Sequence, residues 1–170
     1  RGVRAWGVYD DLVREARLRG LEVYATLAGT PAWATDGPAG TGVPRDAADW
    51  RAFVSEAARR YRGRVKAWGV WNEPNLPAFW SGTRAQYVDL LLRPASEELR
   101  KADPDALVCG PDLAHLKSGG ADWYSWLLDV LRGAGGALDV VTHHVYDGGD
   151  NGNVTRKLDA STSFVWESSW

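Results

Sequence analysis

The sequence predicts an α/β fold in which a parallel sheet is covered by helices. Segments with the periodicity of amphipathic helices alternate with short apolar segments, which are typical of strands buried on both faces. Most connections between successive apolar segments contain such a helix, as crossovers between parallel strands usually do. We expect helices at residues 9–19, 47–62, 84–102 and 122–132. We expect strands at 21–27, 65–71, 106–110 and 138–145, with a last apolar segment at 164–166.

Local signals mark the ends of the predicted helices. Gly20 follows the first helix in the position that a C-terminal glycine prefers, and Asp46 can cap the second. Thr83 and Gln86 form a capping box at the start of the third helix. Pro94 lies inside that helix and is expected to kink it, because proline has no N–H to donate to the preceding turn.

Composition and charge exclude several classes of protein. The 170 residues carry a net charge of -2, so no basic surface suggests nucleic acid as a partner. No segment approaches the ~18 apolar residues of a membrane span. The single cysteine, Cys109, excludes an internal disulfide and a cysteine-based metal cluster, and we expect it in the core. The polar loop 147–153 does not match a calcium-binding loop and is interpreted as solvated.

Chemically distinctive residues fall at the carboxyl ends of the predicted strands, the edge at which α/β folds build active sites. They are Trp33 after the first strand, Asn72 and Glu73 after the second, His144 and Tyr146 at the fourth, and Glu167 after the last apolar segment. Glycoside hydrolysis needs two carboxyl groups flanking the scissile bond, and Glu73 and Glu167 fit that requirement. One glutamate at a strand end is as often a salt-bridge member, but two beside aromatic residues favour catalysis.

The motif around Glu73 resembles a known signature. Segment 71–76 (Trp-Asn-Glu-Pro-Asn-Leu), followed by Phe79 and Trp80, looks like the acid/base signature of clan A glycoside hydrolases. It is closest to family 39, which includes β-xylosidases and related polysaccharide-cleaving enzymes. The resemblance implies that Glu73 is the acid/base and that Asn72 hydrogen-bonds the sugar 2-hydroxyl.

A second resemblance lies at the end of the predicted strand 138–145. The sequence His144-Val145-Tyr146 resembles the His-x-Tyr that follows the sixth strand in this clan. It implies that Tyr146 bonds the nucleophile and that His144 lines the sugar site. Since alternating residues of a strand share a face, His143 should point the other way and is interpreted as structural.

Weaker resemblances concern three other segments. Segment 165–170 (Val-Trp-Glu-Ser-Ser-Trp) resembles the nucleophile segment of the seventh strand, usually Thr-Glu-x-Gly-Trp, from which it departs at two positions. It implies Glu167 as nucleophile and Trp170 as part of the substrate site. Segment 30–33 (Thr-Pro-Ala-Trp) resembles the loop after strand three, which implies that Trp33 contributes to the cleft. Asp112, after the predicted strand 106–110, could line the site or cap a loop.

Aligned on these segments, the chain resembles part of a (β/α)8 TIM barrel, from about strand three to strand seven. Residues 1–170 are then expected to form a single catalytic barrel domain that is incomplete at both ends, since a full barrel needs about 250 residues. The stretch between Tyr146 and Phe164 shows no helix pattern, although a parallel crossover usually contains one. We therefore expect that residues are missing between roughly Asn151 and Val165.

The leading hypothesis is a retaining O-glycoside hydrolase that cleaves a polysaccharide or oligosaccharide by double displacement with two glutamates. It requires no cofactor and no metal, and its partner is the carbohydrate substrate rather than nucleic acid or a membrane. Two alternatives stay open: another clan A endoglycanase of cellulase or mannanase type, and a catalytically inactive carbohydrate-binding barrel remnant. The sugar, the linkage, endo or exo action, the oligomeric state and the compartment, secretion included, also stay open.

Overall fold

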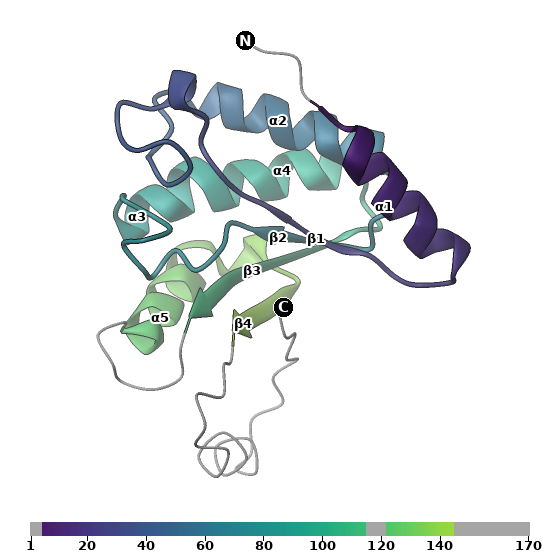
Figure 1. Ribbon diagram of the computed structural model, residues 1–170. Coiled ribbons are helices and arrows are strands. Elements are labelled where there is room, and N and C mark those ends of the chain that lie inside the picture. Colours follow the sequence, from purple (N-terminus) through teal and green to yellow (C-terminus); the bar gives the residue numbers. More distant parts are fainter. Residues whose placement is uncertain (1–4, 115–121, 145–170) are drawn as a thin grey trace, which may run out of the picture.

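A computed structural model describes residues 5–114 and 122–144 of the chain, and within them it contains one four-stranded sheet (Figure 1). The strands are β1 (Tyr24–Leu27), β2 (Ala67–Val70), β3 (Leu107–Ala114) and β4 (Val140–His144). All three pairings are parallel, and the order in the sheet is β1-β2-β3-β4. Tyr146, Glu167, Trp170 and the suspected gap lie outside the described residues.

The main helices are α1 (Gly7–Leu18), α2 (Ala47–Arg60), α4 (Arg93–Ala102) and α5 (Trp123–Ala134). Shorter helical segments are α3 (Arg84–Gln86), η1 (Ala32–Ala34), η2 (Tyr87–Leu92) and η3 (Gly135–Ala137). Helices α2 and α4 lie side by side (Figure 1). Parallel crossovers are right-handed and this strand order never reverses, so the helices belong on one face of the sheet. The other face is then left for the interior of a barrel.

Strand β3 is longer than the prediction. The sequence indicated an end at Gly110, but the strand continues to Ala114 through a cis Gly110–Pro111 peptide bond. The register with β4 shifts between Pro111 and Leu113, which makes the intervening residue part of a bulge. Bulges are among the few places where a sheet tolerates proline, which allows the strand to continue past Pro111. Asp112 is therefore a strand residue rather than a loop residue.

The third helix begins as predicted but changes type along its length. Thr83 Oγ1 accepts from the Gln86 backbone N–H at 3.1 Å, and Gln86 Oε1 accepts from the Thr83 N–H at 2.8 Å. After α3 the chain forms the π-helical segment η2, which ends directly before α4. We expected a kink at Pro94; the structure places Pro94 in the first turn of α4, directly after the π-helical segment. The distortion thus precedes the proline as a π turn.

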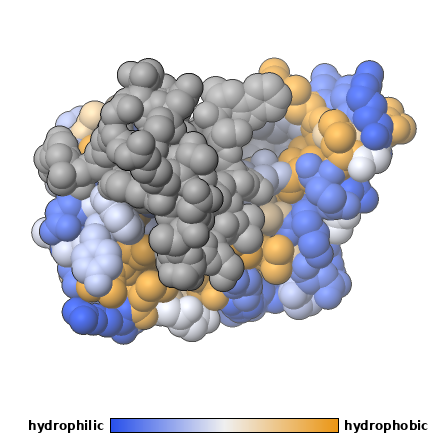
Figure 2. All heavy atoms as spheres, turned by 90° about the horizontal axis from the view of Figure 1, so that it is seen from below, coloured by the Kyte–Doolittle hydropathy of each residue, from blue (hydrophilic) through white to orange (hydrophobic). Residues whose placement is uncertain are grey.

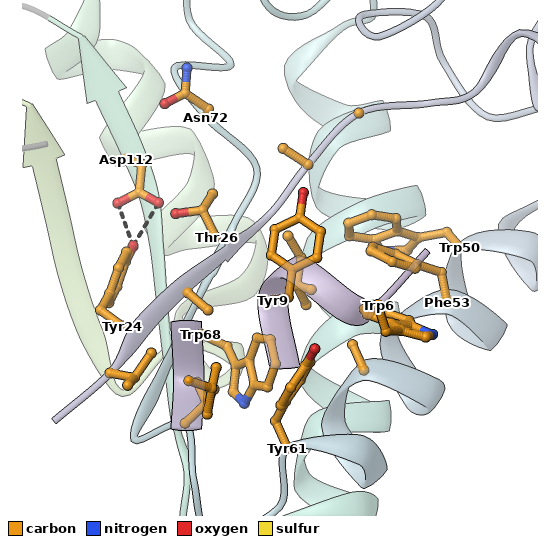
Figure 3. A pocket seen from close by; sticks show the side chains of 18 of the residues that line it. Trp6, Tyr9, Tyr24, Thr26, Trp50, Phe53, Tyr61, Trp68, Asn72 and Asp112 are labelled. Atoms are coloured by element: carbon orange, nitrogen blue, oxygen red, sulfur yellow. Dashed lines mark hydrogen bonds between the residues drawn. The ribbon is translucent and has the colours of Figure 1, made fainter. Parts of the chain in front are cut away.

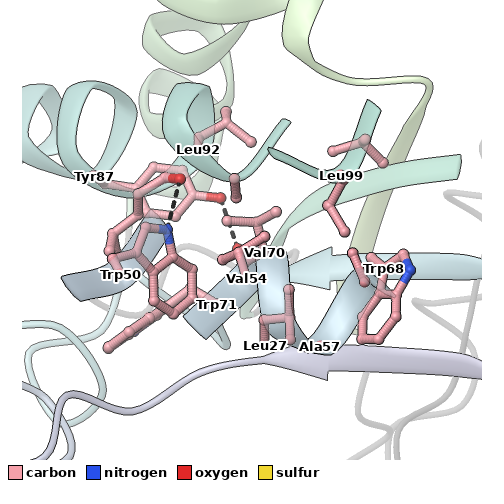
Figure 4. Close-up of a cluster of buried hydrophobic side chains, with 14 of the residues drawn as sticks. Leu27, Trp50, Val54, Ala57, Trp68, Val70, Trp71, Tyr87, Leu92 and Leu99 are labelled. Atoms are coloured by element: carbon pink, nitrogen blue, oxygen red, sulfur yellow. Dashed lines mark hydrogen bonds between the residues drawn. The ribbon is translucent and has the colours of Figure 1, made fainter. Parts of the chain in front are cut away.

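The hydrophobic core lies between the sheet and helices α2 and α4 (Figure 4). Trp50 of α2 donates its indole N–H to Leu91 O at 3.0 Å, and its ring meets Trp71 edge-on with centroids 6.0 Å apart. Tyr87 donates its hydroxyl to Val70 O at 2.9 Å, which ties the end of β2 to the helical layer. Among the described residues the buried tryptophans are Trp50, Trp68, Trp71, Trp80 and Trp126. Cys109 is buried, as expected.

Helix α1 is held mainly by polar and aromatic contacts with α2. Tyr61 donates its hydroxyl to Asp10 Oδ1 at 3.1 Å, and Trp6 stacks on Phe53 with ring centroids 6.0 Å apart. Large apolar side chains of α1 and the turn after it are exposed, among charged ones (Figure 2, right-hand end). Across the described ranges, no helix combines the length and the hydropathy needed to cross a bilayer.

Candidate active site

The candidate site lies at the carboxyl edge of the sheet, where β2, β3 and β4 end. Glu73 follows β2, and its Oε1 is 2.9 Å from Nδ1 of His144, the last residue of β4. Both side chains are removed from water, with residue exposures of 6% for Glu73 and 8% for His144. Two of the residues selected from the sequence, 71 positions apart, are thus in direct contact.

The segment that carries Glu73 has an unusual backbone. Trp71 has φ of 71° and Glu73 has φ of 45°, in the left-handed region that favours glycine. Hydrogen bonds from both neighbouring strands hold it: Trp71 N–H donates to Leu27 O at 2.8 Å, and Glu73 N–H donates to Asp112 O at 3.0 Å. Non-glycine residues stay in this region only where their surroundings over-determine it, which is common at functional sites.

A second clamp on this segment comes from Asn75, to which the sequence analysis gave no role. Its side-chain amide donates to Ala114 O at 2.9 Å and accepts from the Ala114 N–H at 2.9 Å. Asn75 is buried, and the reciprocal pair ties the loop after β2 to the end of β3. The carboxyl group of Glu73 is therefore aimed by a loop that is fixed on both sides.

A tyrosine–aspartate pair connects β1 to β3 across β2 (Figure 3), and its aspartate is the residue whose carbonyl bonds the Glu73 N–H. The hydroxyl of Tyr24 on β1 is 2.9 and 2.8 Å from the two carboxyl oxygens of Asp112 on β3. The pair passes over β2 at Gly69, where an added Cβ would be 2.2 Å from Tyr24 Oη and 2.6 Å from Asp112 Oδ2. Only glycine leaves room for this contact.

Burial sets the protonation of this pair. It raises the pKa of Tyr24 well above the usual range for a phenol, and the neighbouring Asp112 charge raises it further, so the hydroxyl remains a donor. Burial also raises the pKa of Asp112, which is 2% exposed. The nearby Thr142 side chain, the hydrogen bond from Tyr24 and the charge of His144 lower that pKa, while the charge of Glu73 raises it. The net shift for Asp112 is upward.

An open cavity of about 1190 Å³ adjoins these groups, and Tyr24, Asn72 and Asp112 are among the residues that line it (Figure 3). His144 lines it as well. Trp33, in η1 after β1, also lines the cavity and is 45% exposed. The carbonyl of Trp33 accepts a hydrogen bond from the Arg45 guanidinium. Farther from the strand ends the cavity runs between β1 and α1, where its walls are mainly apolar.

The structure thus brings Glu73 and His144 into contact and places Asn72 and Trp33 on the same cavity. His143 packs its ring edge-on against Trp123 of α5, with centroids 5.3 Å apart, as expected for a residue that alternates with His144. Within 5–114 and 122–144, no three His, Cys, Asp or Glu side chains are grouped to hold a metal ion.

Sequence reasoning missed the contribution of Tyr24, Gly69 and Asn75. One signal was available: a lone glycine inside an otherwise apolar strand often marks the close approach of another group. Gly69, between Trp68 and Val70, carries that signal.

Comparison with known proteins identifies the family. The family model described as "Glycosyl hydrolases family 39" matches residues 11–164. The chain belongs to this family. The resemblance of segment 71–76 to clan A enzymes is thereby confirmed.

Two curated β-xylosidases are similar in sequence. The one from Geobacillus stearothermophilus is 33% identical over 113 residues, which are 61% of this chain and 21% of that protein. The one from Caldicellulosiruptor saccharolyticus is 32% identical over 111 residues, which are 61% of this chain and 22% of that protein. The family 39 chain thus matches only about a fifth of the length of these relatives.

Solved structures establish the fold. A GH39 β-xylosidase from Caulobacter crescentus superposes with a TM-score of 0.70 and 27% identity, covering 99% of this chain and 42% of that one. A GH10 protein from Paenibacillus barcinonensis gives a TM-score of 0.62 at 20% identity, covering 84% of this chain and 47% of that one, a likeness of fold alone. The parallel sheet is therefore part of a (β/α)8 TIM barrel, as predicted.

Proposed function

We propose that this family 39 chain contributes to a retaining O-glycoside hydrolase in which Glu73 is the acid/base and Glu167 is the nucleophile. The observation that carries the proposal is the buried contact between Glu73 and His144 at the carboxyl edge of a barrel sheet. The relatives named as β-xylosidases make a β-xyloside the first substrate to test.

The surroundings of Glu73 suit proton transfer. Oε1 is engaged by His144, so we expect Oε2 to face the glycosidic oxygen. In the first step Glu73 gives its proton to that oxygen as the bond to the anomeric carbon breaks, and the carboxylate of Glu167 attacks the same carbon. In the second step Glu73 takes a proton from water, which displaces Glu167 and restores the original configuration.

The remaining predicted residues are assigned to the sugar. We expect Asn72 to bond the 2-hydroxyl, a contact that strengthens toward the transition state in such enzymes. The exposed ring of Trp33 on the cavity is suited to stacking against an apolar sugar face. Tyr146 is proposed to bond the nucleophile, and His144 and Trp170 to line the sugar site. No cofactor or metal takes part in this scheme.

The test uses the full-length protein and two aryl β-xylosides, one with a 2,4-dinitrophenyl leaving group and one with an unsubstituted phenyl group. Glu73→Gln should lower kcat/KM by about a hundredfold or more for the phenyl substrate, which needs acid assistance. The dinitrophenolate leaving group departs without a proton, so kcat/KM for the dinitrophenyl substrate should change little. Glu167→Gln should remove activity on both substrates, because no covalent intermediate forms.

The matched control is Glu97→Gln, on the exposed face of α4, where Glu97 pairs with Arg51. This variant should keep native activity on both substrates. Equal losses on the two substrates for Glu73→Gln would argue against the acid role. No hydrolysis of any glycoside by the full-length protein would favour an inactive carbohydrate-binding protein.

A further inference from the structure

The pair formed by Tyr24 and Asp112 acts on the backbone that carries Glu73. We propose that Tyr24 and Asp112 are positioning residues for the acid/base: their hydrogen bond holds the β3 bulge in the shape that aims Glu73. This inference rests on the proposed role of Glu73. Neither residue belongs to the motif that identified the site.

The first step of the argument is the contact between the bulge and the Glu73 backbone. Asp112 O accepts the Glu73 N–H at 3.0 Å, and Glu73 has φ of 45°. That conformation is strained for a residue other than glycine, so it depends on such bonds. If the Asp112 carbonyl turned away, Glu73 would lose the partner that holds its backbone.

The second step is what holds Asp112 itself. Asp112 also lies in the left-handed region, with φ of 50°, at the register shift in β3. Its carboxyl group is almost fully buried, and the Tyr24 hydroxyl lies within 2.9 Å of both of its oxygens. Without that hydroxyl, a buried carboxyl group loses a donor, which favours rotation of the bulge toward another partner or toward water.

The third step is the surroundings of the pair. The charges of His144 and Glu73 both act on the Asp112 carboxyl group, so the pair belongs electrostatically to the same cluster as the acid/base. Gly69 leaves an open path for it across β2, a space that any other residue would fill. Glycine in the middle of a strand destabilises that strand. Its presence at position 69 therefore points to the Tyr24–Asp112 contact, and not to the strand itself, as the reason for it.

The chain contains a matched pair without this connection. Tyr61 at the end of α2 donates its hydroxyl to Asp10 of α1 at 3.1 Å, between two helices of the outer layer. Tyr61→Phe therefore deletes the same chemical contact away from Glu73. It separates loss of a buried tyrosine hydroxyl from loss of positioning.

The experiment measures how kcat/KM depends on the leaving group in Tyr24→Phe, in the full-length protein. A general acid typically contributes about 10²–10⁴-fold to the rate of such a reaction. Misplacing Glu73 should therefore lower kcat/KM for the phenyl β-xyloside by about tenfold. The value for the dinitrophenyl β-xyloside should stay within about twofold, since that substrate needs no acid. Tyr61→Phe should leave the ratio of the two values unchanged.

A conservative variant tests rescue. Asp112→Asn keeps an oxygen that can accept from Tyr24, so the ratio of kcat/KM for the phenyl and dinitrophenyl β-xylosides should remain near native. Asp112→Ser shortens the side chain that accepts this bond, so it should resemble Tyr24→Phe. Should Tyr24→Phe fail to fold, Asp112→Ser provides the same measurement. Equal losses on both substrates, or none, would overturn the inference. If the loss of kcat/KM in Glu73→Gln does not depend on the leaving group, the proposed function fails. If that loss does depend on the leaving group but the losses in Tyr24→Phe and Asp112→Ser do not, only the positioning role fails.

Discussion

Replacing Gly69 by alanine places one methyl group in the path between Tyr24 and Asp112. The new Cβ would lie 2.2 Å from Tyr24 Oη, 2.6 Å from Asp112 Oδ2 and 2.9 Å from Tyr24 Cζ. Ordinary contacts between such atoms are about 3.5–4.0 Å, so the tyrosine ring has to move. Because the ring is rigid, its hydroxyl leaves the carboxyl group when the ring moves.

The cost has two parts that can be estimated. Losing a hydrogen bond to a charged group costs about 1.5–3 kcal/mol, and overpacking costs about 1–3 kcal/mol. Alanine recovers about 0.5–1 kcal/mol of backbone entropy relative to glycine. The free energy of unfolding should thus fall by about 3 kcal/mol, which lowers Tm by about 6–12 °C for a domain of about 150–250 residues that unfolds cooperatively.

The assay is a double-mutant cycle on unfolding of the native protein, Gly69→Ala, Tyr24→Phe and the double variant. Phenylalanine lacks the oxygen nearest to the new methyl group, so Gly69→Ala should cost at least about 1 kcal/mol less in that background. If Gly69→Ala costs the same in both backgrounds, the methyl group does not act through Tyr24. The steric reading of Gly69 would then be refuted.

Three further predictions concern stability. Because burial raises the pKa of Asp112, the native protein loses stability as pH rises from about 3.9, the unfolded value, through the raised folded value. The Tm of Asp112→Asn minus that of the native protein should therefore grow from pH 4 to 7 in thermal scans, and a constant difference would contradict this. Asn75→Ala removes both bonds to Ala114 and should lower Tm by about 5–10 °C; an unchanged Tm would mean that this clamp is dispensable. Thr83→Ala removes the helix cap and should lower Tm by about 2–4 °C. The ratio of kcat/KM for the phenyl and dinitrophenyl β-xylosides should stay the same, and a changed ratio would link this helix end to the site.

Local patterns in the sequence were enough to predict the main helices and the approximate positions of the strands. Asp46 accepts from the Ala48 N–H at 2.8 Å as a cap should, and α2 ends within two residues of the predicted boundary. The first strand was placed less well, since β1 starts at Tyr24 rather than at residue 21. Pairing with β2, not the apolar pattern, decides where β1 begins.

The site was only partly predictable, for a physical reason. Glu73 and His144 stand out because each lies at the carboxyl end of an apolar strand, and parallel strands bring their carboxyl ends together. Tyr24 and Asp112 are 88 residues apart, and their contact depends on a bulge in β3 and on the register of three strands. A one-residue change in register turns a side chain to the other face, so spacing along the chain does not predict this contact.

The left-handed backbones of Trp71, Glu73 and Asp112 have a consequence for protein engineering. Glycine would adopt each of these conformations without the steric penalty that larger residues carry. At position 73 it would also remove a buried carboxyl group. A library screened only for heat resistance would therefore retain glycine where the proposed chemistry requires glutamate. Selection for thermal tolerance in this chain has to be coupled to an assay of the proposed activity, or it will enrich stable variants that lack the glutamate which that activity requires.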